Sequence, residues 1–141
     1  MKPILLIIGI VLLVVGMASA TQYVELNYHA EQQTNHISVM TPDVGKTFLL
    51  VNIAITNYGY EDVFTNPNYF YVEVNNVRYG YDSASFLLKD LSMPILDTNA
   101  HLADGGQISG YLVFQVPADA KRLTLIYDDG SYPAKEVRYN Q

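Results

Sequence analysis

The side chains best suited to chemistry in this sequence are its tyrosines. The chain has 12 tyrosines and no tryptophan. Tyr58 and Tyr60 flank a glycine in a turn, and Tyr69 and Tyr71 alternate with apolar residues along a strand-like segment. A tyrosine ring offers apolar area and a polar tip at small entropic cost, which suits protein recognition and sugar stacking. The four rings form a candidate interaction face. Cross-strand pairing within a half-exposed sheet remains the other interpretation.

The histidines and serines show no catalytic pattern. His29 and His36 lie seven residues apart in a polar stretch, and His101 lies in an irregular segment, so their spacing does not suit a shared metal. None of the serines stands in a G-x-S-x-G motif, and the chain has no cysteine. The sequence therefore predicts a protein that is not an enzyme, with no catalytic residue, resident metal or organic cofactor.

Acidic turns are the one feature that suits a cation. They lie at Glu61-Asp62, at 104–106 (Asp-Gly-Gly) and at 128–130 (Asp-Asp-Gly). Calcium binds six or more hard oxygens, and loop carboxylates supply them. No D-x-D-x-D-G spacing is present, and Asp-Gly pairs also form good turns without a metal. Calcium at these turns stays an open alternative.

Charge and cysteine content exclude several classes of protein. The formal net charge is −6, and a surface of that sign repels nucleic-acid phosphates. The absence of cysteine excludes disulfides, thiolate metal sites and a lipidated N-terminal cysteine. We expect no nucleic-acid partner and no lipid anchor.

The first 20 residues form an export segment. Lys2 precedes an apolar run of 14 residues from Ile4 to Met17, and Ala18-Ser19-Ala20 follows in the arrangement that a signal peptidase reads. A cleavable hydrophobic segment has about 7–15 residues, and a spanning helix needs about 20. The length favours a hydrophobic helix cleaved after Ala20 and leaves a retained anchor open. The protein is then secreted or held at the cell surface, and we expect membrane contact only through residues 1–20, if they are not cleaved.

Residues 21–141 are predicted to form one β domain. Apolar residues recur with a period of two at 23–28, 48–56, 69–75, 77–81, 107–116, 121–127 and 136–139. Asn75-Asn76 suits a two-residue hairpin turn because asparagine tolerates the left-handed region. We expect a loop at 31–35, and short strands or a helical turn within 82–106. About 7–8 short strands separated by turns indicate an antiparallel sandwich.

A family resemblance points to a particular type of sandwich. The chain has a hydrophobic strand ending in Asn57 before a glycine turn, and fifty residues later Asp104-Gly105-Gly106 precedes the strand from Gly110 to Pro117. This pairing resembles exported immunoglobulin-like domains of archaea and bacteria, a family of unknown function once mislabelled as telomeric-repeat-binding-factor-like. The mycobacterial secreted immunoprotective antigen has the same fold. The resemblance covers about residues 45–127. It implies an all-β immunoglobulin-like fold, a location in the cell envelope, and strand ends at Gly110 and Pro117.

These observations predict a non-enzymatic immunoglobulin-like domain, outside the cell or in the cell envelope, that acts by protein–protein contact. One alternative is a glycan-binding module that uses the same tyrosines with Asn66, Asn68 and Asp62. Another is an anchored structural subunit of a surface filament or envelope complex, assembled by strand addition.

Overall fold

The computed structural model describes residues 21–96 and 99–140. The predicted hydrophobic helix within residues 1–20 lies outside the described residues. Across the described ranges, no helix combines the length and the apolar character needed to cross a membrane.

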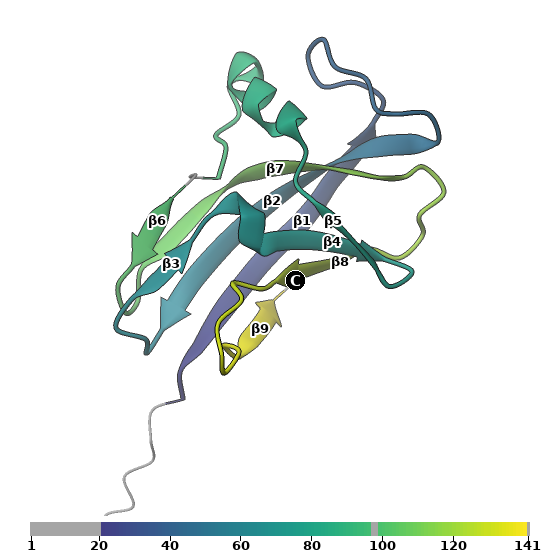
Figure 1. Cartoon of the computed structure of the whole chain (residues 1–141). Coiled ribbons are helices and arrows are strands. Elements are labelled where there is room, and N and C mark those ends of the chain that lie inside the picture. The colour runs from purple at the N-terminus through teal and green to yellow at the C-terminus, as the bar shows by residue number, and fades with distance from the viewer. Residues whose placement is uncertain (1–20, 97–98, 141) are drawn as a thin grey trace, which may run out of the picture.

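Nine strands and two short 3-10 helices make up the described chain (Figure 1). The strands are β1 (Tyr23–Thr34), β2 (Lys46–Tyr58), β3 (Val63–Thr65), β4 (Phe70–Val74), β5 (Val77–Gly80), β6 (Ala100–Leu102), β7 (Gln107–Pro117), β8 (Thr124–Tyr127) and β9 (Val137–Asn140). The helices are η1 (Pro67–Tyr69) and η2 (Ser83–Leu91).

The strands form two facing sheets and a small ribbon. The larger sheet has the order β7-β2-β1-β9, in which β9 runs parallel to β1 and the other pairs are antiparallel. The smaller sheet has the order β5-β4-β8, and β3 pairs with β6 beside it. The mostly-β, sandwich-like architecture expected from the period-two pattern is confirmed.

The core lies between the two sheets. Alternate residues of β4 are buried in the order that the sequence predicts, with Tyr71 and Glu73 less buried than their neighbours. The inward side chains of both sheets join one apolar cluster, which includes Leu26, Val51, Ile53, Phe70, Val72, Leu112, Phe114 and Leu125. The smaller sheet buries one face, so β4 and β8 alternate between core and surface.

A second, smaller core lies on the outer side of the larger sheet. Phe48, Leu50 and Val113 point away from the main core and pack against Ala84 and Leu88 of η2. This explains why the sequence around Phe48 is continuously apolar rather than alternating. Figure 1 shows η2 at the upper end of the sandwich. The segment 82–106, in which short strands or a helical turn were expected, contains the 3-10 helix η2 and, among its described residues, the strand β6.

The predicted loop at 31–35 is wrong over most of its length. Strand β1 continues to Thr34, and its pairing with β2 runs on to Phe48. The register shifts between Ala30 and Gln32, which marks a β-bulge at Glu31. These residues are polar because they lie on an exposed part of the sheet, so their pattern imitates a loop.

Two strands had no usable sequence signal. Both β3 and β6 have three residues, too few to show a period, so residues 21–96 and 99–140 form nine strands where 7–8 were expected. The hairpin turn at Asn75-Asn76 is confirmed, with φ angles of 50° and 64°.

Gly110 has a different role from the one expected. It lies inside β7, so the prediction that it marks a strand end is wrong, whereas Pro117 is the last residue of that strand. The segment Pro94–Leu96 runs along the outer edge of β7, with backbone hydrogen bonds from Tyr111 N–H to Pro94 O (2.9 Å) and from Leu96 N–H to Tyr111 O (3.1 Å). A Cβ at position 110 would lie 2.4 Å from the Leu96 nitrogen. Glycine is therefore required by the close approach of this segment.

Candidate binding surfaces

The four candidate tyrosines do not share one face. Tyr58 projects from the outer side of β2, and Tyr71 projects from the outer side of β4. Because β2 and β4 belong to facing sheets, these two rings lie on opposite sides of the sandwich.

Tyr58 belongs to a stack that crosses three strands. Its ring lies 4.9 Å from the ring of Tyr23 on β1, and the Arg138 guanidinium of β9 lies 3.8 Å from the centre of the Tyr23 ring. The stack ties β9, β1 and β2 together at the point where β1 begins.

Tyr60 lies at the same end of the molecule and also has partners. The ammonium of Lys135 lies 5.6 Å from the centre of its ring, and its hydroxyl lies 3.5 Å from the Gln22 carbonyl oxygen. The Gln22 side chain donates to the Gly59 carbonyl oxygen at 3.1 Å. These contacts fasten the start of β1 to the turn after β2.

Tyr69 and Tyr71 line a shallow depression on the smaller sheet. The Tyr69 ring meets Tyr127 edge-on at 6.2 Å, and the Arg78 guanidinium lies 5.7 Å from the centre of the Tyr71 ring. The depression has a volume of about 310 Å³, and its lining consists of Asn68, Tyr69, Tyr71, Asp128, Asp129 and Gly130. Of the polar residues expected to help bind a glycan, only Asn68 lies here. Asn66 caps η1, and Asp62 pairs with His101 at 3.0 Å.

The carboxylates of the acidic turn at 128–130 are paired with basic side chains of the same domain. Asp128 accepts a hydrogen bond from Arg78 at 3.0 Å, and Asp129 pairs with Lys135 at 2.6 Å, with the Asp129 side chain only 10% exposed. The Gly130 N–H and the Arg78 guanidinium both lower the pKa of Asp128. Burial works to raise the pKa of Asp129, but hydrogen bonds from Lys135 and Ser131 outweigh it and the pKa lies below its ordinary value.

The remaining polar candidates, which are Asp104 and the histidines, lie in separate places. Asp104 accepts a hydrogen bond from the Gly59 N–H at 2.7 Å, which fixes the turn before β7. His29 lies on exposed β1, and His36 contacts Asn35 in the following loop. In the part of the chain that the structure describes, no three His, Asp or Glu side chains come together in a way that could hold a metal ion.

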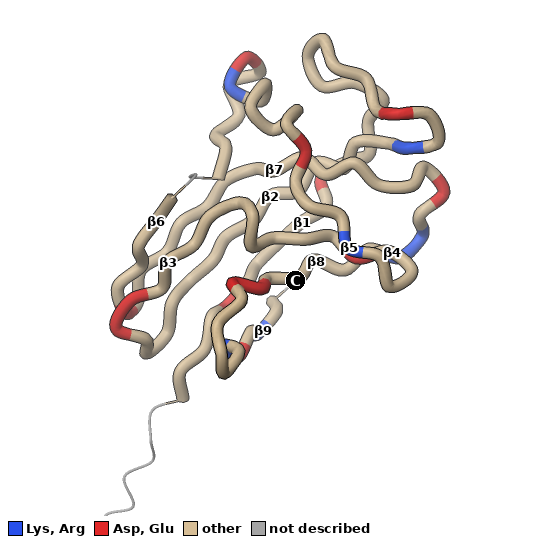
Figure 2. Tube along the Cα trace, in the orientation of Figure 1, with Lys and Arg blue, Asp and Glu red and all other residues tan. Residues whose placement is uncertain are grey.

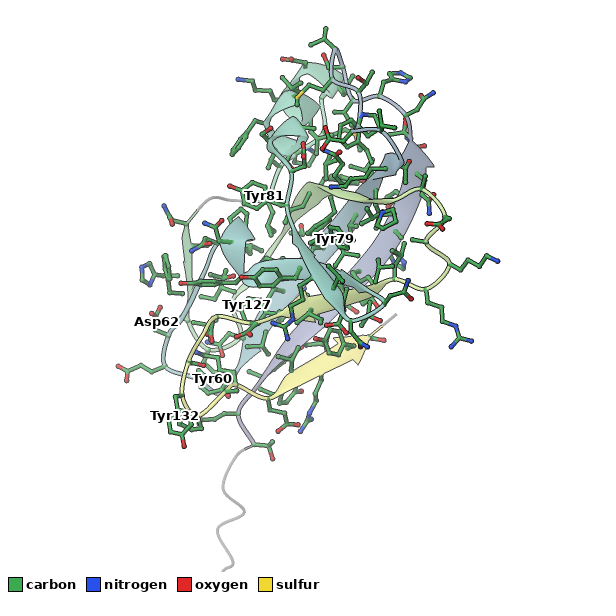
Figure 3. The ribbon with its side chains drawn as sticks, turned by 45° about the vertical axis from the view of Figure 1, so that its right-hand side comes forward. Tyr60, Asp62, Tyr79, Tyr81, Tyr127 and Tyr132 are labelled. Carbon is green, nitrogen blue, oxygen red and sulfur yellow. The ribbon has the colours of Figure 1, made fainter. Side chains whose placement is uncertain are left out.

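The most exposed tyrosine was missed by sequence reasoning. Tyr132 is 100% exposed and precedes Pro133, to which it is joined by a cis peptide bond. Figure 3 shows it beside Tyr60, at the end of the sandwich where β1 begins. The tight turn at 128–130 followed by a Tyr-Pro pair was the available signal, because such a segment is forced to the surface.

An apolar surface lies at the opposite end, which we call the loop end. The loops and η2 at this end carry the exposed apolar side chains Val39, Val44, Phe86 and Leu91. Beside them a pocket of about 430 Å³ opens between the 34–40 loop and the end of η2, lined by Gln32, Thr34, His36, Ile37, Ser38, Leu50, Leu91 and Met93. No period in the sequence could reveal it, because its residues come from segments far apart in the chain.

The fold defines a small, mostly-β domain with sheets in a sandwich-like arrangement. Residues 15–137 match a family model described as a domain of unknown function, DUF4352, and the chain belongs to that family. No curated protein and no solved structure matches the chain.

Proposed function

We propose that this protein is an exported, non-enzymatic, immunoglobulin-like binding domain of the cell envelope, and that its partner is a protein bound at the loop end. The observation that carries this proposal is the pocket of about 430 Å³ with exposed Leu91 on its rim.

The loop end has the composition of a protein-binding surface. Val39 and Val44 are almost completely exposed on loops, and Phe86 and Leu91 are nearly half exposed on η2. Leu91 also lines the pocket. Exposed apolar side chains at the same end of a domain as a pocket are typical of protein interaction sites. A partner side chain of aliphatic or aromatic type would fill the pocket and bury the rim.

The base beneath the pocket is rigid, which favours recognition without rearrangement. Ser85 of η2 accepts a hydrogen bond from the Val113 N–H at 2.8 Å, and the Asp82 N–H donates to the Val113 carbonyl oxygen at 2.7 Å. Leu88 is fully buried against the same sheet. A preorganised surface loses little conformational entropy when it binds.

Two further features support the type of fold and the location. The parallel pairing of β9 with β1, beside an otherwise antiparallel sheet facing a second one, is compatible with an immunoglobulin-like sandwich. The apolar run from Ile4 to Met17 supports export.

Crosslinking in the native envelope tests the proposal. Leu91→Glu together with Val39→Glu should abolish the crosslinked product of the wild-type protein, because two charges would be buried in the interface. Val77→Glu is the matched control: Val77 is half exposed on β5, in the smaller sheet, and its replacement should leave the product unchanged. Equal crosslinking by all three proteins, with unchanged circular dichroism, would refute the loop end as the site.

A glycan-binding function is the second candidate, favoured by the depression at Tyr69 and Tyr71. Two aromatic rings and the exposed amide of Asn68 line it, a combination that suits a sugar ring. Tyr71→Ala should weaken binding to envelope polysaccharide, whereas Tyr71→Leu tests whether apolar area alone suffices.

An anchored structural subunit is the third candidate. Over the described residues, β1 pairs with β9 only from Val24 to Asn27, and from His29 to Thr34 it pairs with β2 alone. This one-sided stretch offers an edge for strand addition.

A further inference from the structure

The end of the sandwich where β1 begins carries a group of tyrosines, which we call the tether end. It consists of Tyr23, Tyr58, Tyr60 and Tyr132. Tyr132 is 100% exposed and Tyr58 is 38% exposed. Figure 3 shows Tyr60 and Tyr132 close together at this end, far from the loop end.

The apolar run of the leader stops close to this surface in the sequence. Only five residues, Ala18 to Gln22, separate Met17 from the start of β1. They span at most about 18 Å when fully extended. Gln22 is itself held by the turn at Gly59 and Tyr60, so the chain has little slack. If residues 1–20 stay in a bilayer, the tether end cannot move far from its surface.

The side chains at this end suit the boundary between lipid and water. Tyrosine combines an apolar ring with a polar hydroxyl and is enriched where membrane proteins cross the headgroup layer. That layer is roughly 5–8 Å thick on each side of the hydrocarbon. A ring at the tip of the turn before Pro133 reaches into such a layer without unfolding the domain. The exposed residues of the loop end are Val, Leu and Phe instead, which have no polar tip.

The charges at the tether end indicate which class of lipid headgroup it can contact. Lys135 and Arg138 are each paired with a neighbouring carboxylate. Glu61, Asp62 and Asp104 are exposed there and leave the surface acidic, as the tube in Figure 2 shows for the turn before β3. An acidic surface is repelled by anionic headgroups and tolerates zwitterionic ones.

We propose that in the anchored form of this protein the tether end rests on a zwitterionic bilayer surface, with Tyr132 and Tyr58 in the headgroup layer. This contact orients the sandwich upright. Strand β1, with 12 residues, then holds the loop end about 40 Å from the lipid. The inference does not depend on which partner binds the loop end.

A single fluorophore tests the contact, because the chain has no tryptophan. The full chain is reconstituted in zwitterionic vesicles, with and without lipids brominated near the headgroup. In the variant Tyr132→Trp, the brominated lipids should strongly quench the tryptophan fluorescence. Its emission should also lie at a shorter wavelength than that of a tryptophan in water. Val44→Trp, at the fully exposed loop end, is the control and should show neither effect.

A second reporter shows whether the tyrosines cause the contact. Ala134 is exposed and lies two residues after Tyr132. The brominated lipids should quench the tryptophan of the variant Ala134→Trp. This quenching should fall several-fold when Tyr132→Ser and Tyr58→Ser are added. Equal quenching at positions 132 and 44 would overturn the proposal, as would quenching at 134 that ignores the serine substitutions. The intact mass of the protein is measured on the same vesicles. A chain that starts at Thr21 would also overturn the proposal, because residues 1–20 would no longer hold the domain at the bilayer. None of these outcomes bears on crosslinking at the loop end.

Discussion

Replacing Gly110 by alanine perturbs the closest backbone contact between the larger sheet and the segment that covers its edge. The added Cβ would lie 2.4 Å from the Leu96 nitrogen and 2.6 Å from its Cα. Both neighbours are backbone atoms, so no side-chain rotation can relieve the overlap. The segment 94–96 must move outward from β7.

The expected cost follows from what this movement breaks. Two backbone hydrogen bonds to Tyr111 are lost, at about 1 kcal/mol each. Leu96, which is 1% exposed, becomes partly exposed, at about 1 kcal/mol for roughly half of its burial. The sum is about 3 kcal/mol, at the upper end of the usual cost of overpacking.

Urea unfolding followed by far-ultraviolet circular dichroism measures this difference. With a slope near 1.5 kcal/mol per molar urea, the midpoint should fall by about 2 M. Gly80→Ala is the matched control, since Gly80 lies on β5 and a Cβ there meets no atom within 4 Å. Its midpoint should change by less than about 0.3 M. Equal midpoints for the two variants would refute the role given to Gly110.

Two further changes test the polar groups that join the elements. Asn57→Ala removes an amide that donates to the Leu102 carbonyl oxygen at 2.8 Å and to the Tyr60 carbonyl oxygen at 2.9 Å, so we expect a loss of about 3 kcal/mol in thermal unfolding. Asn27→Ala, whose amide bonds only a glutamate side chain, should cost far less; a comparable loss would contradict this assignment. In the folded protein the pKa of Asp128 and of Asp129 lies below the unfolded value near 3.9. Their contribution to the free energy of unfolding is therefore present above that pH, and it is lost as the pH falls through the folded pKa values. Stability measured by urea unfolding should therefore decline below about pH 4, and Asp129→Asn should be less stable at pH 7 with a shallower decline; an unchanged pH profile would argue against this pair.

The strongest features of the fold were predictable from local patterns. The alternation in β4 and the hairpin at Asn75-Asn76 were both predicted, because each depends on neighbouring residues and the backbone regions they tolerate. The same reasoning failed for the end of β1, where polar residues pair with β2 along an exposed edge and look like a loop. It also failed for β3 and β6, which are too short to show a period.

The candidate site depended much more on tertiary structure. The sequence identified tyrosine as the notable residue type, but it placed four rings on one face. The sandwich puts Tyr58 and Tyr71 on opposite sides and places Lys135 beside the Tyr60 ring and Arg78 beside the Tyr71 ring.

The sequence by itself determined the residue types, the β class and the apolar run at 4–17, because these follow from composition and from periods of two residues. Only the tertiary structure decided which tyrosine is most exposed, which carboxylates are paired, and that exposed apolar side chains and a pocket lie at the loop end. Those properties depend on contacts between segments far apart in the chain, and such contacts leave no periodic signal in the sequence.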